Sequence, residues 1–186
     1  IDNLILADKK ARLGKSKQKE VIEHDKNRQN NIQTLHETLK TNSYHTSKYE
    51  VFKIYEPKER EIYKLPYFPD RVCHHALMNI LEPIFVKTFI NTTFNCIKNR
   101  GIMGAHRAIV KALKDKQNTI YCLKLDIKKF YPNIDNTILK LLLRKKFKDI
   151  KLLKLLDEII DSVSGCPIGN YCSQFFANFY LTYFDH

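Results

Sequence analysis

The sequence contains no run of apolar residues approaching the roughly 18–20 that a membrane-spanning helix requires, so we expect no membrane partner. It also lacks an initiator Met and a signal-peptide pattern, which predicts an internal boundary at its start. Hydrophobic residues make up 44% and charged residues 28%, a composition that argues against wholesale disorder. At 186 residues, the chain is long enough for one sizeable core or two small lobes.

Paired metal-ligand or disulfide motifs are missing as well. The five cysteines are odd in number and form no CxxC pair, which favours reduced thiols and a cytoplasmic protein over a disulfide framework. His74 and His75 are neighbours, and neighbours on a helix point in different directions. We therefore expect no zinc site.

Acidic residues are scarce relative to basic ones: 20 Asp and Glu stand against 32 Lys and Arg, a formal net charge of +12. An excess of this size favours a polyanionic partner, because cations that neutralise phosphates release condensed counterions. The alternative is a solvated basic surface without a specific partner.

Periodicity and turn signals predict a helix-rich α+β fold. Asp70 is predicted to cap the helix that starts at Arg71, and Pro83 to end or kink it. The predicted helices are about Leu4–Arg12, Lys19–Lys40, Arg71–Leu81, Ala105–Asp115, Asn136–Phe147, Ile150–Ser162 and Tyr171–Asp185.

Three segments are predicted as strands. Tyr49–Tyr55 and Glu61–Leu65 are rich in β-branched and aromatic residues and flank a Pro-bearing turn, which favours a hairpin. Thr119–Ile127 is the clearest candidate for a core strand. Asp126 lies at the end of that strand, where a carboxylate is costly unless a cation or hydrogen-bond donors meet it. It can cap a helix, pair with Lys128 or Lys129, or bind a metal ion.

Several segments, in this order along the chain, resemble motifs of bacterial retroelement reverse transcriptases, and the variant is similar to that of diversity-generating retroelement enzymes. Each motif alone is weak, but their number and order make the resemblance specific, and it covers roughly residues 4–186. The fingers-like segments are Pro57–Ile62, Phe68–Leu77, Leu81–Phe85 and Asn95–Ile102, and the palm-like segments are Asp126–Asp135 and Gly165–Asn178.

The resemblance implies a right-hand polymerase fold with fingers, an incomplete palm and no thumb. Residues 1–48 would form a basic helical extension, 49–115 the fingers and 116–186 the partial palm. It implies an RNA-directed DNA polymerase, a nucleotidyltransferase whose partners are an RNA template, a primer and deoxynucleoside triphosphates. Relatives with this motif variant usually pair with a small basic accessory protein.

The resemblance also implies site residues. Asp126, with the Ile127 backbone carbonyl, would hold Mg²⁺, of which the full enzyme uses two ions. The nucleotide would be bound by Lys58 and Arg60 on the hairpin, by Tyr131 under the sugar, and by Ile168 and Gly169 in the loop before the last helix. Template contacts are implied for Arg71, Lys98 and Arg100, although the first-turn position of Arg71 also suits a structural ion pair.

Two departures from the family's pattern stand out. Many reverse transcriptases have Gln at the position of Ile168, so a polar contact is missing there. The third palm motif, with its pair of aspartates, does not occur in the sequence. We therefore expect a piece of a longer enzyme that is inactive by itself. The alternatives are a degenerate relative, or a non-catalytic RNA-binding module of a retroelement or phage-defence system, which the Lys-rich segment Lys9–Lys19 favours.

Overall fold

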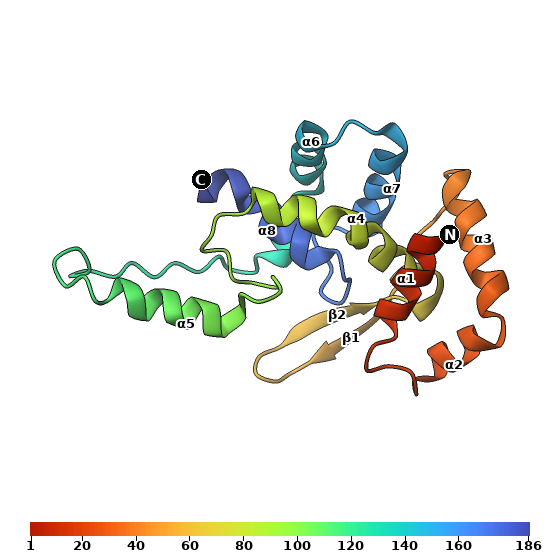
Figure 1. Cartoon of the computed structure of the whole chain (residues 1–186), viewed down its shortest axis with the longest axis horizontal. Coiled ribbons are helices and arrows are strands. Elements are labelled where there is room, and N and C mark those ends of the chain that lie inside the picture. The colour runs from red at the N-terminus through yellow and green to blue at the C-terminus, as the bar shows by residue number, and fades with distance from the viewer.

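A computed structural model describes residues 1–186 as a mainly helical α+β fold built around one long central helix, α4 (Figure 1). The N-terminal helices lie at one end of α4, a β-hairpin lies along one side, and two further helices lie along the opposite side. The helices are α1 (Asp2–Ala11), α2 (Lys19–Lys26), α3 (Arg28–Lys40), α4 (Val72–Thr88), α5 (Gly101–Ala112), α6 (Asn136–Lys146), α7 (Ile150–Asp161) and α8 (Ser173–Asp185). Two short turns, η1 (Tyr67–Arg71) and η2 (Tyr131–Asn133), complete the helical elements.

The predicted N-terminal helices are present, with the second divided in two at Asn27. Helix α1 packs on α4 and buries Leu4, Ala7 and Ala11. Asn3 fixes the register of the two helices, because its side-chain amide donates to the Ala76 carbonyl at 2.9 Å. The basic N-terminal segment is thus packed against the hydrophobic centre of the molecule.

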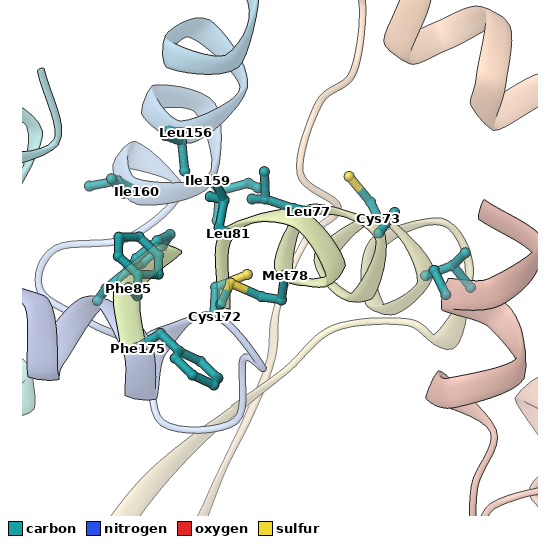
Figure 2. Packing of buried hydrophobic residues seen from close by; sticks show 14 of the residues in the cluster. Cys73, Leu77, Met78, Leu81, Phe85, Leu156, Ile159, Ile160, Cys172 and Phe175 are labelled. Carbon is teal, nitrogen blue, oxygen red and sulfur yellow. The ribbon is translucent and has the colours of Figure 1, made fainter. Parts of the chain in front are cut away.

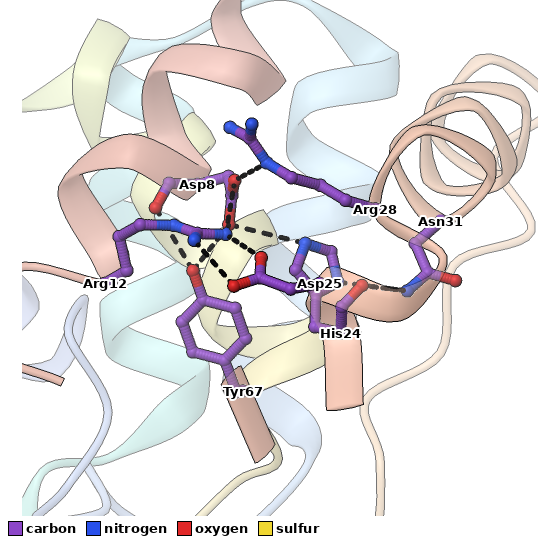
Figure 3. Close-up of polar contacts among 7 residues, drawn as sticks. All are labelled: Asp8, Arg12, His24, Asp25, Arg28, Asn31 and Tyr67. Carbon is purple, nitrogen blue, oxygen red and sulfur yellow. Dashed lines mark hydrogen bonds and ion pairs between the residues drawn. The ribbon is translucent and has the colours of Figure 1, made fainter. Parts of the chain in front are cut away.

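A buried carboxylate joins the N-terminal helices to the turn that precedes α4 (Figure 3). Asp8 has no exposed surface and accepts hydrogen bonds from Arg12 at 3.0 Å, Arg28 at 2.6 Å and the Tyr67 hydroxyl at 2.5 Å. Burial raises the pKa of Asp8, but hydrogen bonds from His24, Tyr67 and the two arginines outweigh it, so the pKa lies well below its usual range. Charged Asp8 therefore holds α1, α2, α3 and η1 together.

The predicted hairpin is confirmed. Strands β1 (Glu50–Ile54) and β2 (Arg60–Lys64) pair antiparallel, with Glu50 opposite Lys64 and Ile54 opposite Arg60. The two strands are each other's only partners, and they form the only sheet in the structure.

Helix α4 forms the centre of a core of 30 buried apolar residues. It faces α7 on one side and the start of α8 on another, with Phe85 fully buried among aromatic rings (Figure 2). Pro83 does not end this helix, as one of the two predicted outcomes required, because α4 continues to Thr88. Proline costs a helix one N–H···O bond. Here the helix is stabilised on both sides of Pro83, by the contacts of the Asn79 side chain with Lys10 and Asn3 before it and by the fully buried Phe85 after it.

The prediction that Asp70 caps the following helix is also wrong. Asp70 lies inside η1 and is fully buried, and its carboxylate accepts from the Tyr44 hydroxyl at 2.7 Å and the Ser47 backbone N–H at 3.0 Å. It anchors the segment that leads into β1, a long-range contact with no local sequence signal.

The C-terminal helices match the prediction closely. Asp135 caps α6 by accepting from the Thr137 and Ile138 backbone N–H groups, and Asp149 caps α7 in the same way through Leu152. Arg144 of α6 forms an ion pair with Asp157 of α7. None of the helices is both long and apolar enough to cross a membrane.

Helix α5 and the segment after it reach away from the rest of the molecule (Figure 1). We call residues 101–130 the arm. The prediction of a core strand at Thr119–Ile127 is wrong: the segment pairs with no strand, and Tyr121, Leu123 and Leu125 are exposed. A strand needs a hydrogen-bonding partner, and β1 and β2, the only strands in the structure, pair with each other.

Candidate functional site

The hairpin meets the glycine-containing loop that precedes α8. The Tyr63 backbone N–H of β2 donates to the Ile168 carbonyl at 2.7 Å. The next residue, Gly169, has φ +128°, and a Cβ there would collide with the Tyr63 carbonyl. Only glycine permits this approach. The loop residues predicted to face a nucleotide thus lie directly against the strand that follows the predicted triphosphate-binding turn.

A second set of contacts joins this loop to the segment after Asp126. The Cys166 backbone N–H donates to the Tyr131 carbonyl at 2.9 Å. At Gly165, with φ +78°, a Cβ would lie 2.7 Å from the Pro132 carbonyl oxygen. Asn136 holds the loop from the other side by accepting from the Gly165 N–H at 3.1 Å. The two palm-like segments, far apart in the sequence, therefore contact each other in space.

Tyr131 itself is half-buried in η2. Its ring lies 5.8 Å from that of Phe130 in an edge-on arrangement. Burial raises the pKa of the Tyr131 hydroxyl, which remains protonated at neutral pH. Because the Tyr131 backbone is held by these contacts, its ring is suited to block the space beside it sterically.

The turn of the hairpin carries unpaired positive charge. Lys58 and Arg60 are exposed and form no ion pair, whereas Glu59 between them pairs with Lys53 at 2.7 Å. The hydrogen bond from Lys53 lowers the pKa of Glu59, with a smaller contribution from the charge of Lys129.

Asp126 is exposed on the arm and forms no ion pair. Asp126 therefore neither caps a helix nor pairs with Lys128 or Lys129, the two structural roles considered for it. No three His, Cys, Asp or Glu side chains gather closely enough to hold a metal ion. Asp126 and the Ile127 carbonyl do not by themselves make a magnesium site, so we derive no chemical step through a metal.

The three residues predicted to contact template differ in their surroundings. Lys98 is exposed. Arg100 is half-buried and donates to the carbonyls of Ile90 at 3.0 Å and Thr93 at 3.1 Å, so part of its guanidinium supports the loop before α5. Arg71 is half-buried without any carboxylate partner, and its Nε atom has no hydrogen-bond partner. The structural ion pair considered for Arg71 is not formed.

Arg71 lines a cavity of about 290 Å³ between η1, β2, the Gly169 loop and the turn after α1. Sequence reasoning missed two other residues of this cavity, Lys15 and His74. The local signals for Lys15 were its place in the Lys-rich segment Lys9–Lys19 and the Gly-Lys pair at 14–15, in a turn where Gly14 has φ +69°. The contribution of His74 depends on tertiary packing and has no such signal.

Comparison with known proteins gives a distant relationship. No protein-family model matches the chain. The chain is 25% identical over 167 residues to the group II intron-encoded protein LtrA of Lactococcus lactis subsp. cremoris, and the protein from strain MG1363 of that organism matches equally. These matches cover 83% of this chain and 27% of the relative, so the chain spans about a quarter of the relative's length. The similarity supports a relationship to retroelement-encoded reverse transcriptases.

Proposed function

We propose that this chain forms the fingers and the first part of the palm of a retroelement RNA-directed DNA polymerase. The observation that carries the proposal is the meeting of three segments. The hairpin, the Gly165–Gly169 loop and the turn at Tyr131 lie together, in the combination that the ordered motifs predict for a nucleotide-binding cleft. The similarity to an intron-encoded protein supports the same assignment.

In this proposal the incoming nucleotide lies beside the point where the hairpin contacts the loop. The free cations of Lys58 and Arg60 neutralise its triphosphate, because fixed positive charge stabilises a transferring phosphoryl group. Tyr131 excludes a ribose 2′-hydroxyl and thereby selects deoxynucleotides. Ile168 and Gly169 line the nucleotide from the loop, which the glycine allows to contact β2.

Asp126 is proposed as one carboxylate of a two-magnesium site, with the Ile127 carbonyl as a further oxygen ligand. The 186 residues do not supply the remaining carboxylates. Arg71, Lys98 and Arg100 are proposed to contact template phosphates, which carry no sequence information and position the strand.

Template-primed incorporation of deoxynucleotides by the natural protein that carries this chain tests the assignment. We expect Asp126→Ala to reduce incorporation to background, because the variant removes a metal ligand without disturbing a buried contact. Asp115→Ala is a matched control, since it removes another exposed carboxylate from the arm, and it should leave incorporation unchanged. Near-normal activity of the Asp126→Ala protein would end the proposal.

A second experiment addresses the nucleotide contacts. Lys58→Gln and Arg60→Gln are expected to raise the KM for deoxynucleotides, because each removes a cation that neutralises the triphosphate. Tyr131→Ala is expected to increase incorporation of ribonucleotides relative to deoxynucleotides. An unchanged KM together with unchanged sugar selectivity would place the nucleotide elsewhere.

Binding of RNA without catalysis is a second candidate function, favoured by the net charge of +12. It predicts salt-sensitive RNA binding by the 186 residues and no incorporation by the natural protein. RNA affinity that barely changes with salt would count against phosphate contacts of any kind.

A further inference from the structure

The connection between α6 and α7 carries a dense group of lysines. Residues 145–154 contain five lysines and a single acidic residue, Asp149, which leaves an excess of four positive charges. All five lysine side chains are exposed, and none of them forms an ion pair. We call this group the α6–α7 lysine surface, and its members are Lys145, Lys146, Lys148, Lys151 and Lys154.

The carboxylates around this surface have partners of their own. Asp149 caps α7 by accepting from the Leu152 backbone N–H at 2.7 Å. The acidic residues of α7 bind basic side chains or backbone groups outside the surface, and they are Asp157, Glu158 and Asp161. The positive charge at the connection therefore stays largely uncompensated within the chain.

Helix stability accounts for only part of this charge. Lys145 and Lys146 lie in the last turn of α6, where the helix dipole favours a cation. The Lys145 ammonium also lies 5.4 Å from the centroid of the Tyr183 ring, a contact that keeps the lysine charged. Lys151 lies at the start of α7, where the dipole disfavours a cation. Its charge gains nothing from its own helix, and an anion outside the chain would stabilise it.

The composition of the surface favours a nucleic acid over a protein or a membrane. Protein interfaces are depleted of lysine and enriched in aromatic residues, whereas the one aromatic residue of this stretch, Phe147, is buried. A membrane surface requires several exposed apolar side chains beside the cations, and Ile150 is the only large one exposed here. A phosphodiester backbone requires only closely spaced cations.

The surface lies apart from the proposed nucleotide site. Helices α6 and α7 lie on the side of α4 opposite the hairpin (Figure 1). The hairpin carries Lys58 and Arg60, which are proposed to bind the triphosphate. A nucleic acid on the α6–α7 lysine surface is therefore a different segment from the strand copied beside the hairpin.

We propose that the α6–α7 lysine surface binds the phosphodiester backbone of a nucleic acid at a place separate from the copied strand. The phosphates belong either to a single strand or to a folded duplex, which present the same charged groups. The surface goes beyond the proposed function and does not require polymerase activity. RNA binding without incorporation and incorporation without this binding are distinguishable outcomes.

Fluorescence-anisotropy titration of a labelled RNA hairpin with the 186-residue chain tests the surface. The double variant Lys151→Gln, Lys154→Gln removes two unpaired charges that are neighbours on one face of α7. It is expected to weaken RNA binding about tenfold at low salt. It should also lower the slope of log affinity against log salt by about one to two, because two phosphate contacts are lost.

The matched control is the double variant Lys26→Gln, Lys40→Gln, which removes the same net charge. Both lysines are exposed, but each already pairs with a carboxylate, Glu23 or Glu37. This variant should change the affinity by less than about threefold and leave the salt slope unchanged. Equal weakening by the two double variants, or no RNA binding by the unmodified chain at low salt, would overturn the proposal.

A charge-retaining variant separates charge from fold. Lys151→Arg with Lys154→Arg keeps both cations and should keep the RNA affinity, and thermal unfolding verifies that every variant is folded. A tenfold loss in the folded arginine variant would show that charge is not the cause and would contradict the proposal.

Incorporation by the natural protein tests whether the surface is separate from the copied strand. On a short template-primer at saturating concentration, the Lys151→Gln, Lys154→Gln protein should retain normal incorporation while its affinity for the RNA hairpin falls. Parallel loss of incorporation and of affinity would place the surface on the path of the template and refute a separate site.

Competition identifies the class of partner. Displacement of the labelled hairpin by unlabelled hairpin but not by oligouridylate would assign the surface to duplex RNA, and equal displacement by both would extend it to single strands. Either result supports the proposal. Displacement by polyglutamate at the same concentration of charge, as effective as that by RNA, would assign the surface to acidic proteins and rule out the proposed partner.

Discussion

The arm and the rest of the molecule, which we call the body, have similar shares of apolar residues. These residues are largely buried in the body and exposed in the arm. In the body, α4 buries most of its residues against α1, α7 and α8. In the arm, α5 buries none, and Ile102 and Leu123 are more than four-fifths exposed. The difference shows that an apolar pattern decides which face can be buried, while burial itself requires a surface to pack against. The arm has apolar residues but no such surface within this chain.

The largest expected effect of a single substitution lies at the centre of the body. Phe85→Ala is expected to reduce the free energy of unfolding by about 3–5 kcal/mol, because it leaves a cavity where the ring met those of Phe147, Phe176 and Phe179. Urea denaturation followed by circular dichroism measures the change. A loss below about 1 kcal/mol would mean that the body is as loosely packed as the arm.

The ionic junction of the body should be nearly as sensitive. Asp8→Asn is expected to cost about 3 kcal/mol, because it leaves Arg12 and Arg28 without the buried carboxylate that compensates them. Glu23→Gln is a control, because Glu23 is an exposed carboxylate of α2 whose ion pair with Lys26 contributes little. Equal stability of the two variants would show that Asp8 does not hold the N-terminal helices.

Buried histidines give the body a dependence on pH. Burial is the main cause that lowers the pKa of His74 and of His75 to about 4. In the unfolded chain each protonates near its ordinary pKa of about 6.5, so the unfolded state binds protons first. Stability is therefore expected to fall as pH drops from about 6.5 towards 4, by up to about 3 kcal/mol for fully buried His74.

A substitution at His75 tests this origin. His75 stacks on Tyr171 with ring centroids 4.0 Å apart, and both of its ring nitrogens lack partners. His75→Phe keeps a stacked ring without a titrating group, so it should remove about half of the acid-induced loss. An unchanged pH profile of the unfolding free energy would assign the loss to other groups.

A smaller effect is expected where the loop meets the hairpin. Gly169→Ala should cost about 1–2 kcal/mol for the positive φ alone, and the added methyl must also displace the Tyr63 carbonyl. Gly14→Ala is the matched control, since Gly14 also has positive φ but nothing lies near its Cβ position. A greater loss at Gly169 than at Gly14 would reflect the loop–strand contact together with the more restrictive backbone angle of Gly169.

The sequence predicted the elements whose signal is local. Helices α6, α7 and α8 follow from apolar periodicity, and the hairpin follows from its turn. The predictions that were wrong share a physical cause. Residues distant in the chain determine that α4 continues through Pro83 and that Asp70 anchors the segment before β1. They also determine that two positive charges, those of Lys15 and Arg71, act on each other.

The predicted site residues divide along the same line. Ile168, Gly169 and Tyr131 were named from motif order, and the structure brings their segments into contact. Asp126 was expected at the end of a buried strand and lies on the exposed arm instead. Strand formation is a property of pairs of segments, so the apolar run at 119–127 indicates a capacity to pair without supplying the partner.

The smallest expected change in unfolding free energy is for a substitution on the arm. This substitution is the sharpest test of the comparison between the arm and the body. Leu123→Ala should change the unfolding free energy of the 186-residue chain by no more than about 0.5 kcal/mol, because the side chain is 83% exposed and contacts no core. A loss comparable to that of Phe85→Ala would require the segment to be buried in solution, as the sequence predicts for a core strand. Hydrogen exchange at residues 119–127 separates the two cases, since unpaired amides exchange rapidly and a paired strand protects every second one.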